Sequence, residues 1–201
     1  KTAYEIPLRL VGSEMCIRDS KISHQGIIVE TKTLNYPKLD DVIDSSNIMI
    51  ALDQVTDPQN VGAIIRTFSF FGGENLLITK DHSSEINGSL AKSASGALES
   101  VNIIKVTNLS MTLKKIRKKG FTIIGLDENS DVMLHNTNDY SNEKKVLVMG
   151  SEGKGLRRLT KENCDFLVSI ANNNDSDFNT LNVSVSSALA LYEFMGRDIK
   201  K

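Results

Sequence analysis

Three segments of this 201-residue chain carry polar residues of the kinds that bind ligands. Residues 53–66 (DQVTDPQNVGAIIR) place an asparagine and an arginine on the first turns of a helix, and residues 148–156 (VMGSEGKGL) form a glycine-rich turn with one carboxylate. Residues 179–188 (NTLNVSVSSA) combine hydroxyl and amide groups at the start of an apolar helix. Amides, a guanidinium and a carboxylate can orient a substrate through charge-assisted hydrogen bonds, and glycines let the backbone approach a ligand closely.

Each segment also has an ordinary structural explanation. Asn60 can cap a helix, residues 150–155 can form a tight connection, and Thr180 with the serines after it can serve as cap and packing residues. The glycines match neither the GxxxxGK[ST] spacing of a phosphate-binding loop nor the GxGxxG spacing of a dinucleotide fold. Nucleotide hydrolysis and hydride transfer are therefore poorly supported, whereas the three segments together favour a binding or catalytic site.

Short apolar runs that are rich in isoleucine and valine alternate with helical patterns from residue 47 onward, as in strands buried on both faces of a sheet. We expect strands at 47–52, 75–79, 101–106, 121–126, 145–149 and 166–170, and helices at 58–72, 85–98, 109–119, 156–162 and 181–195. This alternation predicts an α/β fold with a mostly parallel sheet flanked by helices. The three polar segments then fall on strand-to-helix loops, at the usual ligand-binding edge.

Composition narrows the classes of protein. The chain is 40% hydrophobic and 24% charged with a net charge of -1, and no apolar run approaches the roughly 18 to 20 residues of a membrane span. We expect a cytoplasmic protein without a membrane segment. Cys16 and Cys164 have no paired spacing, which argues against a disulfide framework, and no His/Cys cluster offers a metal site. The net charge does not by itself indicate nucleic-acid binding, although basic residues cluster at 114–119 and around Arg157.

The runs DPQNVGAIIR, LVMGSEGKGLRRLT and TLNVSVSSALALYE resemble the three motifs of the SpoU family of the SPOUT superfamily, which methylates ribose 2′-hydroxyls of ribosomal or transfer RNA. HQGI at 24–27 and the segment at 80–109 are similar to the bacterial branch that modifies a guanosine of 23S ribosomal RNA. The resemblance implies a C-terminal trefoil knot, S-adenosylmethionine as the cofactor and RNA as the partner. It also implies a homodimer through the last helix, which is apolar on more than one face.

The resemblance assigns a role to individual residues. The catalytic candidates are Asn60, Arg66, Glu152 and Asn182. The cofactor contacts, largely through backbone, fall on Gly150, Ile170 and Leu181, with Gly125 and Leu126 from a preceding strand end. The substrate-binding candidates are Arg66, Thr180, Lys154 and Arg157. We expect Arg66 to hold the phosphate beside the reacting ribose, and Glu152 to orient Arg66 or Asn60 by a charge-assisted hydrogen bond.

The sequence departs from the family pattern at two places. Ala171 and Thr180 replace the usual Pro and Ser, and the loop 171–179 is longer and acidic, which predicts a lower cofactor affinity. At the front, residues 1–20 contain VGSEMCIRDS, which resembles a translated adapter, so we interpret them as foreign. We assign 21–46 to the linker remnant of a missing N-terminal RNA-binding domain and 47–201 to the methyltransferase domain.

Two other functions stay open at this point. One is a ribose methyltransferase of the same family acting on transfer RNA. The other is an inactive, dimeric RNA-binding module, which the altered third motif suggests. The four intact catalytic candidates argue against the inactive module.

Overall fold

The computed structural model describes residues 9–11, 28–30, 36–136, 143–172 and 180–197. The chain divides into two compact units, residues 1–35 and Tyr36–Lys201. In the first unit, β1 (Arg9–Val11) pairs antiparallel with β2 (Ile28–Glu30). The first of these strands falls in the segment interpreted as foreign, and the rest of that segment lies outside the described residues.

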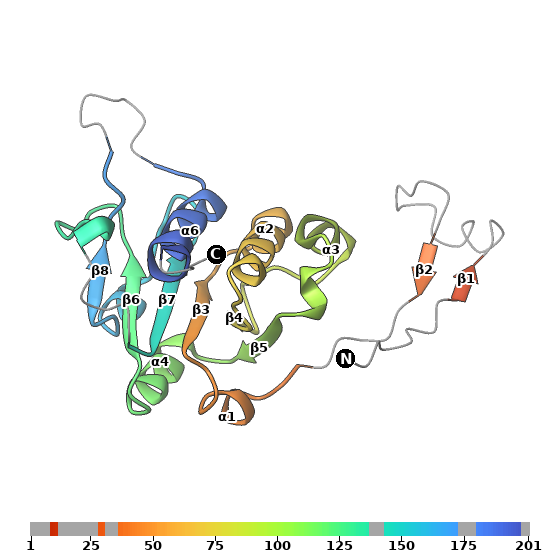
Figure 1. Ribbon diagram of the computed structural model, residues 1–201, viewed down its shortest axis with the longest axis horizontal. Helices are drawn as coiled ribbons and strands as arrows, with labels where there is room; N and C mark the ends of the chain where they lie inside the picture. The colour runs from red at the N-terminus through yellow and green to blue at the C-terminus, as the bar shows by residue number, and fades with distance from the viewer. Residues whose placement is uncertain (1–8, 12–27, 31–35, 137–142, 173–179, 198–201) are drawn as a thin grey trace. The chain divides into compact units, whose positions relative to one another are not determined.

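The second unit is built on a six-stranded parallel sheet with the order β5-β4-β3-β7-β6-β8 (Figure 1). Its strands are β3 (Ile48–Asp53), β4 (Asn75–Thr79), β5 (Asn102–Val106), β6 (Thr122–Leu126), β7 (Lys145–Gly150) and β8 (Phe166–Val168). The predicted α/β class and parallel sheet are confirmed. All six strands begin within one residue of the expected position, because most of their apolar runs are buried on both faces.

Helices cover both faces of this sheet. One face packs against α2 (Pro58–Phe70), α3 (Gly88–Ala94) and α6 (Val183–Leu191), and the other against α1 (Leu39–Val42) and α4 (Leu109–Arg117). Successive side chains of β3 alternate between the two hydrophobic cores. Ile50 and Leu52 lie in the core under α2, α3 and α6, and Met49 and Ala51 lie in the core under α1 and α4. The remaining helical pieces are α5 (Arg158–Lys161), η2 (Ala97–Glu99), η3 (Leu134–Asn136) and η5 (Tyr192–Gly196).

Two helix predictions are wrong in detail. The helix expected at 85–98 is interrupted where Ser95 and Gly96 take positive φ values of 49° and 88°, and the chain resumes as the 3-10 turn η2. The helix expected at 181–195 begins at Val183, because Asn182 caps it, and its last turn is the π-helix η5. Sequence periodicity does not report such local changes of winding.

Part of the expected linker is structured. Leu39 and Ile43 are buried in the core beneath α4, so the compact unit begins at Tyr36 rather than at residue 47. The leucine and isoleucine at a four-residue spacing within LDDVI are consistent with one buried helical face.

The strand order reverses next to β3. From β3 the chain builds β4 and β5 outward on one side, and β7 returns to the other side of β3, with β6 and β8 beyond it. In open α/β sheets such a switch point, at the carboxyl ends of the strands, is where ligands bind. The C-terminal trefoil knot stays a prediction, because residues 173–179 of the C-terminal segment lie outside the described residues. Within the described ranges no helix is long and apolar enough to cross a membrane.

Candidate active site

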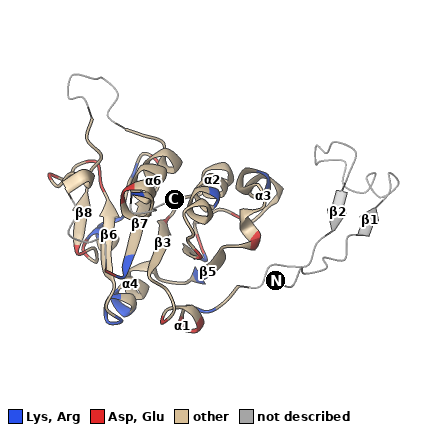
Figure 2. Ribbon diagram, in the orientation of Figure 1, with Lys and Arg blue, Asp and Glu red and all other residues tan. Residues whose placement is uncertain are grey.

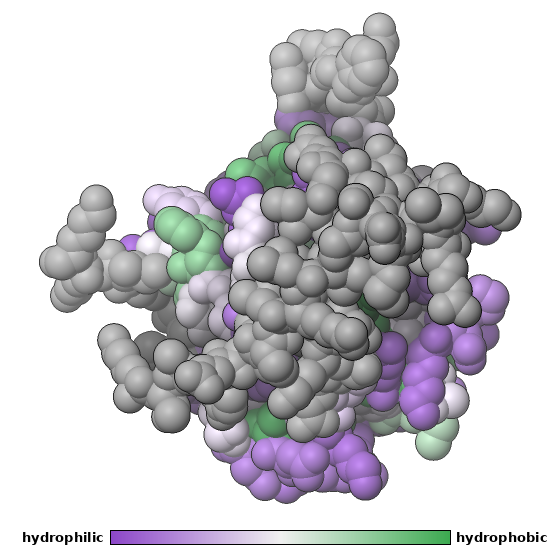
Figure 3. All heavy atoms as spheres, turned by 90° about the vertical axis from the view of Figure 1, so that its right-hand side faces the viewer, coloured by the Kyte–Doolittle hydropathy of each residue, from purple (hydrophilic) through white to green (hydrophobic). Residues whose placement is uncertain are grey.

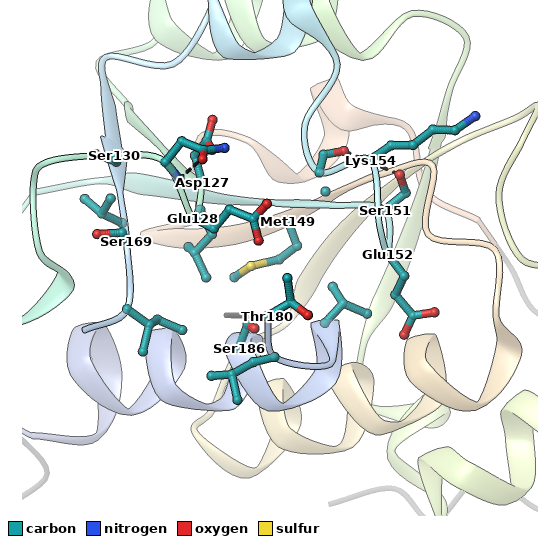
Figure 4. Close-up of a pocket in the computed structure, with 18 of the residues that line it drawn as sticks. Asp127, Glu128, Ser130, Met149, Ser151, Glu152, Lys154, Ser169, Thr180 and Ser186 are labelled. Atoms are coloured by element: carbon teal, nitrogen blue, oxygen red, sulfur yellow. Dashed lines mark hydrogen bonds between the residues drawn. The ribbon is translucent and has the colours of Figure 1, made fainter. Parts of the chain in front are cut away.

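A cavity of about 520 Å³ opens at the carboxyl ends of β6, β7 and β8. Its volume lies in the range of sites that bind small organic molecules. Met149 points into the space between Glu128, from the loop after β6, and Thr180 and Ser186, from the side of α6 (Figure 4). The walls thus combine apolar surface with a few converging polar groups, as a site for an amphipathic cofactor requires.

The glycine-rich loop after β7 forms one wall of this cavity. Ser151 and Gly155 exchange two backbone hydrogen bonds, of 3.1 and 2.9 Å, which close residues 151–155 into a tight turn. A Cβ on Gly150 would lie 2.2 Å from the carbonyl carbon of Gly155, so only glycine fits at this position. The backbone of Gly155 and Leu156 therefore packs directly against the end of β7.

An ion pair between a buried carboxylate and an exposed arginine holds the far end of the same loop. The Asp53 carboxylate, at the end of β3, has no solvent exposure. It accepts hydrogen bonds from the backbone N of Arg157 at 2.9 Å and from its side-chain Nε at 2.6 Å. Arg157, a predicted RNA contact, thus turns part of its guanidinium inward. Sequence reasoning missed Asp53, because an acidic residue at the end of a buried strand does not indicate which distant residue it will pair with.

The three polar segments meet in one hydrogen-bond network. Glu152 Oε1 accepts from Asn60 Nδ2 and, at 2.9 Å, from Asn182 Nδ2. Asn60 is nearly buried, with 8% exposure, and the cap of α2 is Asp57 instead, so the capping explanation for Asn60 is wrong. Asn182 does cap α6, because its Oδ1 accepts from the backbone N of Ser184 at 2.8 Å.

Arg66 lies away from this network. It is exposed on α2, and its Nη1 donates to Ser95 Oγ at 3.2 Å. Six residues along a helix correspond to an advance of about 9 Å and a rotation of about 120° relative to Asn60. Of the two orientations expected for Glu152, the structure places the carboxylate on Asn60.

A second ion pair borders the cavity. Lys161 of α5 binds Asp127, which follows β6, and both line the cavity. Burial raises the pKa of Asp127, but hydrogen bonds from Lys161 and Asn129 and the lysine charge outweigh it and hold the pKa below its ordinary value. Asp127 is therefore ionised at neutral pH. Neither residue was predicted, since a lone Asp after a strand and a Lys on a short helix carry no motif.

Residues 47–192 match the family described as the SpoU rRNA Methylase family. The chain belongs to this family. The family predicted from the three motifs is confirmed, and the network of Asn60, Glu152 and Asn182 contains one residue from each motif.

Named relatives of the SpoU family support the assignment. The chain is 40% identical over 174 residues to the 23S rRNA (guanosine-2'-O-)-methyltransferase RlmB of Ralstonia nicotianae, covering 85% of this chain and 68% of the relative. The protein of the same name from Blochmanniella floridana is 39% identical, with 88% and 71% covered.

Solved structures share the fold. An AdoMet-bound rRNA methyltransferase from Sinorhizobium meliloti has a TM-score of 0.79 at 21% identity, covering 92% of this chain and 70% of that one. The SpoU methyltransferase AviRb of Streptomyces viridochromogenes, in complex with AdoMet, has a TM-score of 0.77 at 20% identity, with 96% and 84% covered.

The cavity gathers most of the cofactor candidates that the SpoU resemblance supplied. Its lining includes Gly150, Ile170, Leu181 and Leu126, together with the substrate candidates Thr180 and Lys154. Ala171 and Asn172, which begin the altered loop, also line it, and residues 173–179 of that loop lie outside the described residues.

Gly125 is placed differently from the other cofactor candidates and is not among the residues that line the cavity. A Cβ there would lie 2.8 Å from Cys164 Sγ and from Leu156 Cδ1, so this glycine makes room for packing behind β6. Burial raises the pKa of the Cys164 thiol to about 12, so the thiol is neutral and a poor nucleophile at neutral pH.

Proposed function

We propose that this chain transfers a methyl group from S-adenosylmethionine to the ribose 2′-hydroxyl of a guanosine in 23S ribosomal RNA. The observation that carries the proposal is the network in which Glu152 accepts from Asn60 and Asn182 beside a small-molecule cavity. Family membership and relatives named for this reaction support it. We place the activity in the cytoplasm.

The cavity fits the cofactor. Its volume suits a nucleoside-sized molecule, and Gly150 at the end of β7 is one of the residues that line it. We assign the cofactor contacts to Gly150, Ile170, Leu181 and Leu126. When bound, the cofactor supplies an electrophilic methyl group on a sulfonium sulfur. Three carboxylates (Asp127, Glu128 and Glu152) and two lysines (Lys154 and Lys161) line the cavity, and this excess of negative charge favours a cationic ligand.

The protein must orient the ribose and accommodate the proton that its hydroxyl loses. Asn60 is held by Glu152 on one side of the site, and Asn182 is fixed twice, by Glu152 and by capping α6. We assign Arg66 to the phosphate next to the reacting ribose, where a guanidinium binds as a charged fork. Thr180 and Lys154, on the cavity wall, are the remaining substrate contacts. This is catalysis mainly by positioning.

We further propose that the chain works as a homodimer. Helix α6 and the residues that flank it expose a stripe of large apolar side chains: Leu181 (52% exposed), Val185 (47%), Leu189 (42%) and Tyr192 (56%). Their spacing of three and four residues puts them on one side of the helix. An isologous contact through this stripe would bury it next to the active site.

A transfer RNA ribose is the second candidate substrate. A relative from Bacillus subtilis, 33% identical over 176 residues, is named as a putative TrmH family tRNA/rRNA methyltransferase. Methyl transfer from radiolabelled S-adenosylmethionine to transcribed 23S RNA and to transcribed transfer RNA, with the modified ribose mapped by primer extension, separates the two. Label in the transfer RNA alone would overturn the ribosomal assignment.

Cofactor binding can be tested without knowing the RNA. S-adenosylhomocysteine should raise the melting temperature of the chain, because a ligand that binds only the folded state stabilises it by about 2.7 kcal/mol at one hundred times its Kd. Adenosine at the same concentration is the control. No shift at millimolar S-adenosylhomocysteine would contradict the proposed function.

A further inference from the structure

A second hollow lies along the edge strand β5 and reaches the face of the sheet that α1 and α4 cover. It has a volume of about 400 Å³ and is walled by Tyr36, Leu39, the end of β5 and the first turns of α4. None of its eleven lining residues is Asp or Glu, and four are lysines: Lys38, Lys80, Lys105 and Lys115. We call this hollow the lysine groove.

The concentration of charge in the lysine groove is unusual for this chain. Lysine and arginine make up 24 of 201 residues, balanced by 25 acidic ones, so eleven residues at random would carry little net charge. Basic residues are visible on α4 and near β5 in Figure 2. The space-filling view shows a strongly hydrophilic area at the lower edge of the molecule, at the height of these helices in Figure 1 (Figure 3).

Local contacts hold the groove's lysines in place. Lys105 Nζ lies 4.3 Å from the centre of the Tyr36 ring, a cation–π contact, and Lys115 binds Asp40 of α1. The backbone of Lys80 donates to the carbonyl of Val106 at 2.8 Å, which brings the end of β4 to the groove. The α4 amino terminus, beginning after Thr107, adds partial positive charge to the same place.

The groove also has a defined position relative to the active site. Lys80 follows β4 and Thr107 follows β5, so both lie at the carboxyl edge of the parallel sheet, as does the cavity. From β5 to β7 there are three strand spacings of about 4.8 Å, which gives a lateral distance of about 14 Å. A polynucleotide with its reacting nucleotide in the active site can reach this distance with a few further nucleotides.

We propose that the lysine groove binds the phosphodiester backbone of the RNA next to the nucleotide that is methylated. This inference rests on the proposed function. Lysine is a compact point charge, suited to phosphate contacts that position RNA without reading its sequence. Lys115 is paired with Asp40, and the three other amines still exceed what one isolated phosphate needs, so a chain of phosphates is the ligand class that matches. RNA would also relieve the mutual repulsion of the lysines in the free protein.

The test compares two triple variants of equal charge in the full chain. In the groove variant, Lys38, Lys80 and Lys105 become Gln, and Lys115 is left intact because it pairs with Asp40. In the control variant, Lys92, Lys114 and Lys118 become Gln; all three are exposed and none lines the groove. The probe is transcribed 23S RNA, whose affinity is measured by fluorescence anisotropy over a range of salt concentrations.

The groove variant should bind RNA more weakly at low salt, and the magnitude of its salt slope should fall by about 2, near 0.7 for each lost phosphate contact. The control variant should keep most of the wild-type slope. Equal losses in both variants, or no loss in either, would overturn the lysine groove as an RNA site.

Titration with S-adenosylhomocysteine separates this inference from the proposed function. All three proteins should bind it equally, because the groove does not line the cofactor cavity. Wild-type protein that binds S-adenosylhomocysteine but not RNA overturns the groove and leaves the cofactor assignment standing. Wild-type protein that binds RNA with the predicted difference between variants, but not S-adenosylhomocysteine, supports the groove and contradicts methyl transfer.

Discussion

Glu152 accepts two amide hydrogen bonds through the same oxygen, and this arrangement depends on its charge. Hydrogen bonds to a charged group contribute about 1.5–3 kcal/mol, and each 1.36 kcal/mol is a factor of ten in rate. Glu152→Gln should therefore lower kcat/KM by about tenfold or more and leave S-adenosylhomocysteine affinity nearly unchanged. Methyl transfer kinetics and calorimetry measure both quantities. Glu162→Gln, at the exposed residue that follows α5, is the control, and equal activities of the two variants would contradict the role of Glu152.

Replacement of Arg66 tests whether this residue binds the phosphate next to the reacting ribose. Arg66→Ala should abolish methyl transfer and keep cofactor affinity near that of the wild type, because the cofactor is held mainly by backbone on other elements. The matched control is Ser95→Gly, which removes the hydroxyl bound to Arg66 and suits the positive φ at this position. If Arg66→Ala kept most of its activity, Arg66 would be a structural partner of Ser95.

A variant of Arg157 tests whether this residue stabilises the fold through its ion pair with Asp53 or binds RNA. Arg157→Met removes the Nε donor from a fully buried carboxylate and should lower the free energy of unfolding by about 2 kcal/mol. It should also weaken S-adenosylhomocysteine binding, because Asp53 fixes the end of the glycine-rich loop. Arg158→Met, at an exposed position, is the control for urea unfolding. If Arg157→Met left the free energy of unfolding unchanged and weakened RNA binding, Arg157 would be a substrate contact only.

At the scale of elements, the glycine-rich loop is the least tolerant part of the site. Gly150→Ala would bring a Cβ within 2.6 Å of backbone atoms of Gly155 and Leu156, and backbone cannot yield as a flexible side chain does. We expect cofactor affinity to fall at least tenfold, a change of about 1.4 kcal/mol or more. Gly153→Ala, whose Cβ would have open space but whose φ is +75°, controls for backbone strain elsewhere in the loop. Equal cofactor affinities of Gly150→Ala and Gly153→Ala would show that the loop backbone shifts to make room for the Cβ at position 150.

Elements differed in how well the sequence predicted them. The strands were predictable because burial on both faces leaves continuous apolar runs. The order of the strands was not, since β7 lies between β3 and β6 through pairings between residues far apart in sequence. The break at Ser95 was also hidden, because serine is compatible with a helix interior and its φ of 49° follows from the turn toward η2.

The residues of the candidate site also differed in whether the sequence could predict them. Asn60, Glu152 and Asn182 could be predicted because they lie in the three segments that resemble the SpoU motifs, which follow β3, β7 and β8 at one edge of a parallel sheet. Asp53 and Asp127 could not, because their ion pairs depend on which loops become neighbours after folding. Gly125 had the right location along β6, but its missing side chain serves packing against Cys164.

At the scale of the whole molecule, the exposed stripe on α6 predicts the assembly. The wild-type chain should be a dimer by light scattering at micromolar concentration. Val185→Glu with Leu189→Glu should give a monomer, because two charges per copy would be buried at an isologous contact. Phe70→Glu, at an 80% exposed position on α2, is the control for loss of surface hydrophobicity. A wild-type monomer would contradict the homodimer.

The place of β7 in the sheet has a consequence for how the chain folds. While the protein is being made, β3, β4 and β5 can pair as soon as they emerge, yet the other side of β3 stays open until Lys145–Gly150 are synthesised. An open strand edge is a template for pairing with other chains. Pairing between distant segments is also slow, because the loop between them must close first. We therefore expect nascent chains that stop short of β7 to aggregate, and refolding to be limited by the insertion of this one strand.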